Sequence, residues 1–138
     1  MTYDVVVAGG GPAGVTSAIY TARAGLSTKV FDPMGGGGQA GTTDKLYNYP
    51  GFPQGVSGPE LMDAMIEQAK VFGADIEYGE AISVEKDGNL FFIESDNSVV
   101  RSKALIWAAG TTPRTLNVPG EKQFTGRGVS FCATCDGP

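Results

Sequence analysis

The residues best suited to chemistry lie near the end of the sequence, where Cys132 and Cys135 are separated by two residues and Asp136 follows directly. Two thiols at this spacing can form and break a disulfide, and the adjacent carboxylate can exchange the proton that accompanies the electrons. Inert thiols or a static disulfide are the alternatives. A bridge this short removes little loop entropy from the unfolded chain, so a purely stabilising role is a poor use of it. The pattern favours disulfide oxidoreduction.

The composition excludes several other kinds of site. The 138 residues include no histidine and two cysteines, so one chain cannot build the usual Cys/His zinc site or a histidine-based triad. We therefore expect no metal. The net charge of −5 argues against a nucleic-acid or anionic-membrane partner, because either needs a basic surface. No apolar run reaches membrane-spanning length and the first residues do not resemble a signal peptide, so we expect a cytoplasmic protein.

A second candidate site lies at the other end of the chain, where Gly9, Gly11 and Gly14 have the GxGxxG spacing. Such glycines let backbone N–H groups approach a pyrophosphate at the positive N-terminus of a helix, and a side chain at Gly11 would block that approach. Pro12 suits the first turn of the helix, and Ala13 is small enough to lie close to a sheet. A glycine-rich turn without a ligand is the alternative. Because the same chain contains this nucleotide-binding pattern, a redox role for the CxxC pair is better supported than it would be by the two cysteines alone.

The elements around these glycines are those of a nucleotide-binding fold. Residues 3–8 form a mostly β-branched run that is typical of a buried parallel strand, and the helix after the glycines is expected to end at Gly25. A second strand, Lys29–Phe31, ends at Asp32, about 20 residues beyond the glycines, where an acid can accept hydrogen bonds from a ribose. Asp32 could instead be a turn former or a helix cap.

Residues 33–58 lack regular periodicity and form a long connection. A loop of this length inside a compact domain is usually functional or disordered, and the aromatic residues and prolines around Asn48 favour the first. The glycines up to Gly38 permit close backbone approach, and the amides of Gln39 and Asn48 could hydrogen-bond the edge of a ring. For residues 35–38 alone, a flexible glycine linker is the alternative.

The second half of the sequence predicts a helix, an antiparallel meander and a buried strand. A pattern resembling a capping box, Ser57–Glu60, begins the helix, and Gly73 ends it. Four short strands are expected in the meander, at residues 75–78, 81–85, 90–94 and 98–101. The apolar run 104–110 is typical of a buried parallel strand, and the glycine at its end, Gly110, lets the backbone face a ligand.

In combination these motifs resemble the low-molecular-weight, bacterial-type thioredoxin reductases with a CATC redox centre. The match runs through the whole chain in order and is carried by Gly9–Gly14, Gly37–Gln39, Asn48–Gly51, Gly58–Met62, Ala104–Ile106 with Gly110, and Gly126–Ser130 leading into Cys132–Gly137. The resemblance implies an α/β fold: a Rossmann-like FAD-binding domain with a parallel sheet, a glycine finger and a small antiparallel meander. It also implies truncation at the start of a second, NADPH-type domain. We expect residues 1–113 to form the first domain and residues 114–138 a linker and the incomplete second one.

The resemblance also implies roles for individual residues. In the family the glycine finger and the acid matching Asp32 bind the FAD pyrophosphate and ribose, and residues matching Gln39 and Asn48 approach the flavin. Backbone near Ala81 and Ile82 meets the adenine. Ala109 stands where the family often has threonine. The cofactor-binding residues expected on these grounds are Gly9, Gly11, Pro12, Ala13, Gly14, Asp32, Gly38, Gln39, Asn48, Ala81, Ile82, Ala109 and Gly110.

The implied reaction passes electrons from NADPH through FAD and the Cys132/Cys135 disulfide to thioredoxin. The cysteine matching Cys135 takes electrons from the flavin, the one matching Cys132 attacks the partner, and the acid matching Asp136 handles protons. The resemblance also implies a homodimer in the parent protein. Two alternatives stay open: a reductase linked to ferredoxin, flavodoxin or a peroxiredoxin system, and, for a full-length chain, a non-catalytic nucleotide-binding redox module. Because no NADPH domain is present in the sequence, the isolated chain is expected to show little or no turnover with NADPH.

Overall fold

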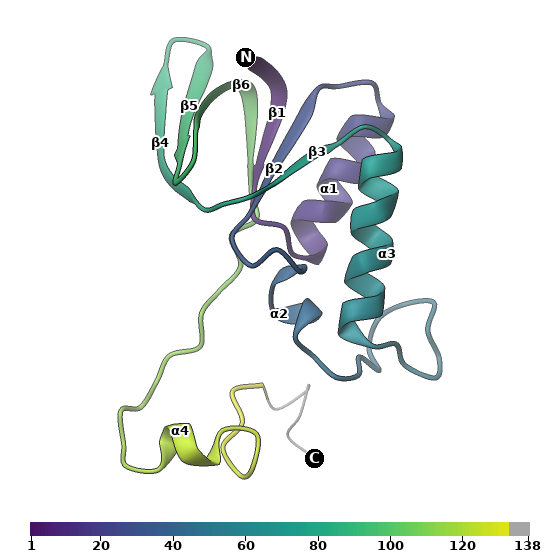
Figure 1. Cartoon of the computed structure of the whole chain (residues 1–138), viewed down its shortest axis with the longest axis vertical. Helices are drawn as coiled ribbons and strands as arrows, with labels where there is room; N and C mark the ends of the chain where they lie inside the picture. Colours follow the sequence, from purple (N-terminus) through teal and green to yellow (C-terminus); the bar gives the residue numbers. More distant parts are fainter. Residues whose placement is uncertain (133–138) are drawn as a thin grey trace.

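The computed structural model describes residues 1–132 and contains one six-stranded mixed sheet with helices packed on it (Figure 1). The strand order is β3-β2-β1-β6-β5-β4. The elements are β1 (Thr2–Ala8), α1 (Pro12–Arg23), β2 (Thr28–Asp32), α2 (Gly38–Gly41), α3 (Gly58–Val71), β3 (Asp75–Tyr78), β4 (Ala81–Asp87), β5 (Leu90–Ser95), β6 (Val99–Trp107) and α4 (Glu121–Phe124). Cys135 and Asp136 lie outside the described residues.

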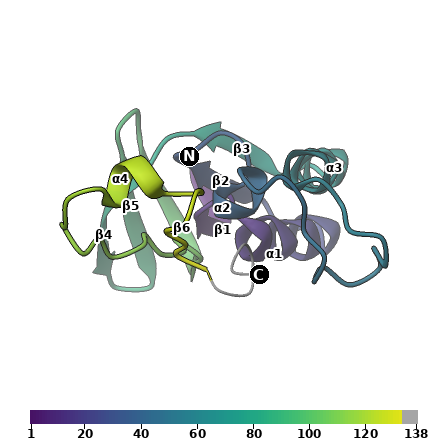
Figure 2. The same ribbon diagram turned by 90° about the horizontal axis from the view of Figure 1, so that it is seen from below.

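The two faces of the sheet are buried in different ways. Helices α1 and α3 lie side by side on one face, and the β4–β5 hairpin lies away from them on the other side of the molecule (Figure 2). Two clusters of buried residues correspond to these faces. The helix-side cluster includes Val5, Val7, Val15, Val30, Leu61 and Met62, and the meander-side cluster consists of Tyr3, Val6, Phe31, Ile93 and Val100. The expected α/β, Rossmann-like architecture is confirmed.

Strand β3 belongs to the parallel half of the sheet, so its predicted place in the antiparallel meander is wrong. It pairs in parallel with β2, with Lys29 opposite Asp75 and Val30 opposite Ile76. The intervening helix α3 carries the chain back to the starting edge of the sheet, and a crossover of this kind produces parallel neighbours. The meander consists of β4, β5 and the first half of β6.

Strand β6 is continuous, although two separate strands were predicted over its length. Its first part pairs antiparallel with β5, and a longer part pairs in parallel with β1, from Thr2 opposite Arg101 to Ala8 opposite Trp107. The residues between the two predicted strands, Ser102 and Lys103, contain no glycine or proline that would stop the pairing. One strand therefore joins the meander to the parallel half of the sheet.

The start of α3 also differs from the prediction. Ser57 is the N-cap residue, but its side chain makes no capping hydrogen bond, and Glu60 is exposed. Pro59, in the first turn, has no N–H to be capped, and the N–H of Gly58 is satisfied by the carbonyl of Thr43 at 3.0 Å. The loop before α3 thus provides a hydrogen-bond acceptor at the start of the helix, in place of a capping box.

A buried lysine ties β2 to β3. Lys29 Nζ lies 2.8 Å from Asp75 Oδ2 and 2.5 Å from Glu77 Oε2, and its side chain is 8% exposed. Tyr3 Oη donates a 2.8 Å hydrogen bond to the same Asp75 oxygen. Burial lowers the pKa of Lys29, but the hydrogen bonds to the two acids outweigh it and the pKa is raised. Burial and the bond to Asp75 raise the pKa of Tyr3 as well.

These shifts predict a loss of stability in alkali. Groups whose pKa is raised by folding stabilise the protein below their unfolded pKa, about 10 for Tyr and Lys, and this contribution disappears as the pH rises through the folded values. We expect Tyr3→Phe to reduce the drop in unfolding free energy between about pH 8 and pH 11, measured by urea denaturation. Tyr20→Phe is the control, because Tyr20 is 66% exposed on α1 and should leave the wild-type pH dependence unchanged. Equal pH profiles for Tyr3→Phe and wild type would contradict this account.

The segment after β6 leaves the sheet and runs to the short helix α4 (Figure 1). Glu121, at the start of α4, accepts hydrogen bonds from the backbone N–H groups of Leu116 at 2.7 Å and Asn117 at 2.8 Å, which closes the chain into a compact turn. None of the helices within residues 1–132 combines the length and the apolarity needed to cross a membrane.

Candidate cofactor site and redox segment

A pocket of about 530 Å³ lies where β1, β2 and β6 end. Crevices outside the carboxyl ends of parallel strands are the usual ligand sites of open α/β sheets, and this volume is within the range of such sites. The pocket is lined by Ala8–Ala13, Asp32–Met34, Gly38–Ala40, Glu80, Ala81 and Trp107–Thr112. Residues from the glycine finger, the long loop, the meander and the end of β6 therefore meet at one place.

The glycines of the finger have two different roles. A Cβ on Gly14 would lie 1.9 Å from the carbonyl oxygen of Gly9, and one on Gly9 would lie 2.1 Å from the carbonyl oxygen of Ala108. These two glycines allow α1 and β6 to pack against the turn. A Cβ on Gly11 would have only one neighbour within 4 Å, the Gly37 carbonyl oxygen at 3.9 Å. Gly11 lines the pocket, so the space beside it is available to a ligand.

The N-terminus of α1 faces the pocket and is suited to an anion. No side chain caps it, no acid lies in its first turn, and Pro12 and Ala13 line the pocket. The helix has 12 residues, enough for a substantial macrodipole. Among the pocket-lining residues in the described part of the chain there is no lysine or arginine. An anion bound here would therefore be held by backbone N–H groups and the helix dipole.

Asp32 lines the pocket and at the same time organises the turn after β2. Its side chain is buried, with Oδ1 accepting a hydrogen bond from the Met34 N–H at 3.0 Å and Oδ2 one from the Gly37 N–H at 3.4 Å. Asp32 therefore does form the turn, as the alternative interpretation of this residue proposed. Each carboxylate oxygen keeps a second lone pair, so Asp32 can still accept a hydrogen bond from a ligand hydroxyl.

The glycine-rich loop brings a polar side chain, that of Gln39, to the pocket. Gly38 begins α2 with a positive φ of 65°, and a Cβ there would lie 3.3 Å from the Cα of Gly11. Gln39 follows and its Nε2 donates a hydrogen bond to the carbonyl oxygen of Thr111, in the segment after β6. This bond links the loop to the end of β6. Of residues 35–38, Gly38 begins α2 and lines the pocket, and the N–H of Gly37 donates to Asp32.

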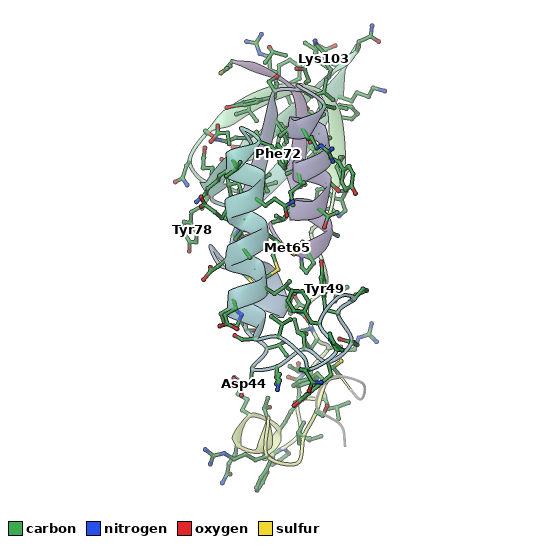
Figure 3. All side chains as sticks on the ribbon, turned by 90° about the vertical axis from the view of Figure 1, so that its right-hand side faces the viewer. Asp44, Tyr49, Met65, Phe72, Tyr78 and Lys103 are labelled. Atoms are coloured by element: carbon green, nitrogen blue, oxygen red, sulfur yellow. The ribbon has the colours of Figure 1, made fainter. Side chains whose placement is uncertain are left out.

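The other expected cofactor-binding residues divide into two groups. Ala81, Ala109 and Gly110 line the pocket, whereas Gly14, Asn48 and Ile82 do not. Gly14 packs against the Gly9 carbonyl, and Ile82 is 62% exposed on β4. Asn48 is exposed beside Tyr49, whose hydroxyl contacts the Met65 sulfur at 3.5 Å and holds this part of the loop against α3 (Figure 3).

Ten of the described pocket residues were not expected from the sequence: Ala8, Gly10, Pro33, Met34, Ala40, Glu80, Trp107, Ala108, Thr111 and Thr112. Each of them is within three residues of an expected one. Glu80 precedes Ala81, and the backbone N–H of Gly79 donates to the carbonyl of Asp32 at 3.1 Å, which draws the β3–β4 connection over the end of β2. Alternation of strand side chains and this crossing connection are the signals that point to these residues.

Only the first residue of the predicted redox centre falls within the described part of the chain. Cys132 is disulfide-bonded, and its backbone N–H donates to Ser130 Oγ at 3.1 Å. Cys132 does not line the pocket. Within residues 1–132 there is no cluster of three or more His, Cys, Asp or Glu side chains that could hold a metal ion.

Comparison with known proteins places this geometry in a family. Residues 3–138 match the sequence pattern of the pyridine nucleotide-disulphide oxidoreductases. A thioredoxin reductase of Mycolicibacterium smegmatis is 47% identical over 135 residues, covering 98% of this chain and 43% of the relative. A thioredoxin reductase of Bacillus subtilis is 44% identical, covering 98% of this chain and 42% of the relative. The chain thus spans less than half the length of these relatives.

The solved structures agree with the sequence comparison. The crystal structure of thioredoxin reductase from Streptococcus pyogenes superimposes with a TM-score of 0.88 at 40% identity, covering 99% of this chain and 44% of that one. The expected relationship to the thioredoxin reductases is confirmed. From its glycine finger, its sheet and these matches, the chain belongs to the pyridine nucleotide-disulphide oxidoreductase family, and its homologues are enzymes of the thioredoxin reductase group.

Proposed function

We propose that this chain is the FAD-binding and disulfide-bearing part of a thioredoxin reductase. The observation that carries the proposal is the ligand-sized space beside Gly11, at the uncapped N-terminus of α1, in a chain that also contains the CxxC pair. When bound, FAD would supply a two-electron carrier between a reduced nicotinamide and a disulfide. The family match and the names of the relatives support this choice of cofactor and reaction.

The residues of the pocket fit such a cofactor. The backbone of Gly11–Ala13 would hold the pyrophosphate at the positive end of α1, and Asp32 would accept a hydrogen bond from a ribose hydroxyl. Gln39 is proposed to lie near the flavin, because it lines the pocket and is held there by its hydrogen bond to Thr111. The open N-terminus of α1 would offset the two negative charges of the pyrophosphate. These contacts would therefore position the cofactor without a basic side chain.

The two cysteines are proposed to carry out the exchange with the partner. The thiolate of Cys132 would attack the disulfide of thioredoxin and form a mixed disulfide, and Cys135 would then displace the reduced partner and restore the Cys132–Cys135 bond. Asp136 would take up and return the proton that this exchange requires, a role that suits a carboxylate in a chain without histidine. Two electrons and two protons thereby pass from the dithiol to thioredoxin. We propose a homodimer and a cytoplasmic location, where disulfides are chiefly transient and catalytic.

The electron donor distinguishes the main proposal from its closest alternatives. NADPH is proposed because the family is defined by a pyridine nucleotide, whereas a ferredoxin- or flavodoxin-linked enzyme would use a protein donor with the same CxxC pair. Residues 114–138 are proposed to begin the domain that would bind NADPH.

The isolated 138-residue chain is expected to show no NADPH-dependent reduction of thioredoxin above background. The sequence contains one glycine finger, so it offers no second nucleotide site for the donor. The measurement is NADPH oxidation at 340 nm with thioredoxin and added FAD. A chimera in which residues 1–138 replace the matching part of the M. smegmatis relative is the positive control, and it should be active. Clear turnover by the isolated chain would contradict the proposed division of labour between the two domains.

A further inference from the structure

The pocket contains an aromatic side chain that neither the packing nor the glycine finger explains. Trp107 is the one tryptophan of the sequence, and it is the last residue of β6. The residue lines the pocket but is 65% exposed, which is unusual for a residue type that is mostly buried in folded proteins. A large flat surface is therefore presented at the edge of a ligand-sized space.

The topology determines which side of the pocket Trp107 occupies. Trp107 pairs with Ala8 of β1, and the next N–H, that of Ala108, donates to the Ala8 carbonyl at 2.8 Å, so the end of β6 is firmly held. Leu105, two residues earlier and thus on the same face of the strand, packs on the meander-side cluster together with Ala81. Trp107 therefore lies toward the meander, on the same side as Glu80 and Ala81, which also line the pocket.

The two ends of the pocket suit different parts of a ligand. At the finger, the open N-terminus of α1 attracts an anion. At the meander side, the carboxylate of Glu80 repels one, and no lysine or arginine among the described pocket residues compensates for it. An uncharged flat ring is the group that gains from an exposed indole there, because stacking buries apolar area on both partners.

We propose that Trp107 is an affinity-determining residue that stacks on the adenine base of the bound dinucleotide. The inference rests on the proposed FAD site and adds to it a contact for the base. In this arrangement the pyrophosphate lies at Gly11–Ala13, and the adenine lies between Trp107 and the backbone around Ala81.

The emission of Trp107 provides a direct test, because the isolated chain has no other tryptophan. Titration of the purified chain with ADP is expected to quench or shift this emission, and calorimetry should give an affinity for ADP and for FAD. Trp107→Ala is expected to weaken both affinities by about 10-fold, in line with the usual contribution of an aromatic side chain to base stacking. Trp107→Phe should retain most of the affinity because it keeps a ring. FMN lacks the adenine, so its binding should be unchanged by Trp107→Ala.

The control variant is Tyr20→Ala, which removes an aromatic side chain of nearly equal exposure, 66%, that does not line the pocket. It should bind ADP like the wild type. Equal ADP affinity for Trp107→Ala and wild type, or an emission spectrum unaffected by saturating ADP, would overturn the inference and leave the FAD site standing. A loss of FMN binding as large as the loss of ADP binding would place Trp107 at the flavin and would also overturn it. A wild-type chain that binds neither FAD nor ADP would contradict the proposed function itself.

Discussion

Replacing Gly11 with alanine is expected to lower the affinity of the chain for ADP and FAD by about 10- to 100-fold while the fold stays intact. A methyl group there meets nothing closer than 3.9 Å in the protein, and the backbone φ of −73° suits alanine. The methyl group would instead occupy the space through which a pyrophosphate reaches the first turn of α1. The loss of one or two hydrogen bonds to a charged group corresponds to this change in affinity.

Gly14→Ala is the matched control for Gly11→Ala. The new methyl group would lie 1.9 Å from the Gly9 carbonyl oxygen, so the helix and the finger would have to move apart. We expect a decrease of about 1–3 kcal/mol or more in the free energy of unfolding, measured by urea denaturation. Gly11→Ala should change it by less than about 1 kcal/mol. Wild-type nucleotide affinity in a folded Gly11→Ala variant would contradict the placement of the pyrophosphate.

Replacing Cys132 with serine is expected to reduce thioredoxin reduction to background in the chimera with the M. smegmatis relative. Serine has nearly the same size but cannot form a disulfide, so no mixed disulfide with the partner is possible. The variant should still contain flavin and should still consume NADPH when an artificial electron acceptor is supplied. This second assay is the control, because it distinguishes loss of the thiol that reduces thioredoxin from loss of the flavin. Substantial thioredoxin reduction by Cys132→Ser would show that Cys132 does not attack the partner.

The parallel half of the sheet could be predicted because the local sequence patterns and the packing between elements require the same residues there. The β-branched residues of β1, the GxGxxG spacing and the acid at the end of β2 all indicate one strand-turn-helix-strand unit. Its glycines are also required by the packing, as the close approach of Gly14 to the Gly9 carbonyl shows. A sequence pattern of this kind predicts the structure well because few other structures require glycines at this spacing between a strand and a helix.

The partners of β3 and the continuity of β6 could not be predicted with the same success. The residues of β3 resemble those of the meander strands, and only the return path of α3 decides that β3 pairs with β2. Lys29 then finds Asp75 and Glu77, an arrangement that depends on strand register and leaves no trace in either strand alone. Strand pairing is a property of the whole sheet, so local patterns underdetermine it.

The pocket was predicted better on its finger side than on its meander side. The finger residues lie close together in the sequence, whereas Glu80 and Trp107 reach the pocket from different strands. In the sequence, Trp107 looks like an ordinary residue of a buried strand. In the structure it is the last residue of β6 and lines the pocket. Asn48 does not line the pocket, and the contact of its neighbour Tyr49 with Met65 holds that part of the loop against α3. Its place near the flavin stays a prediction.

The central claim is that one path connects the pocket at Gly11 to the thiols at Cys132. The most direct test is thiol titration of the flavin-containing chimera after anaerobic addition of one equivalent of NADPH. The account predicts two new thiols per chain, none in Cys132→Ser, and none in the wild type when the flavin has been removed. New thiols that appear without flavin, or a flavin that is reduced by NADPH while the disulfide stays intact, would contradict it.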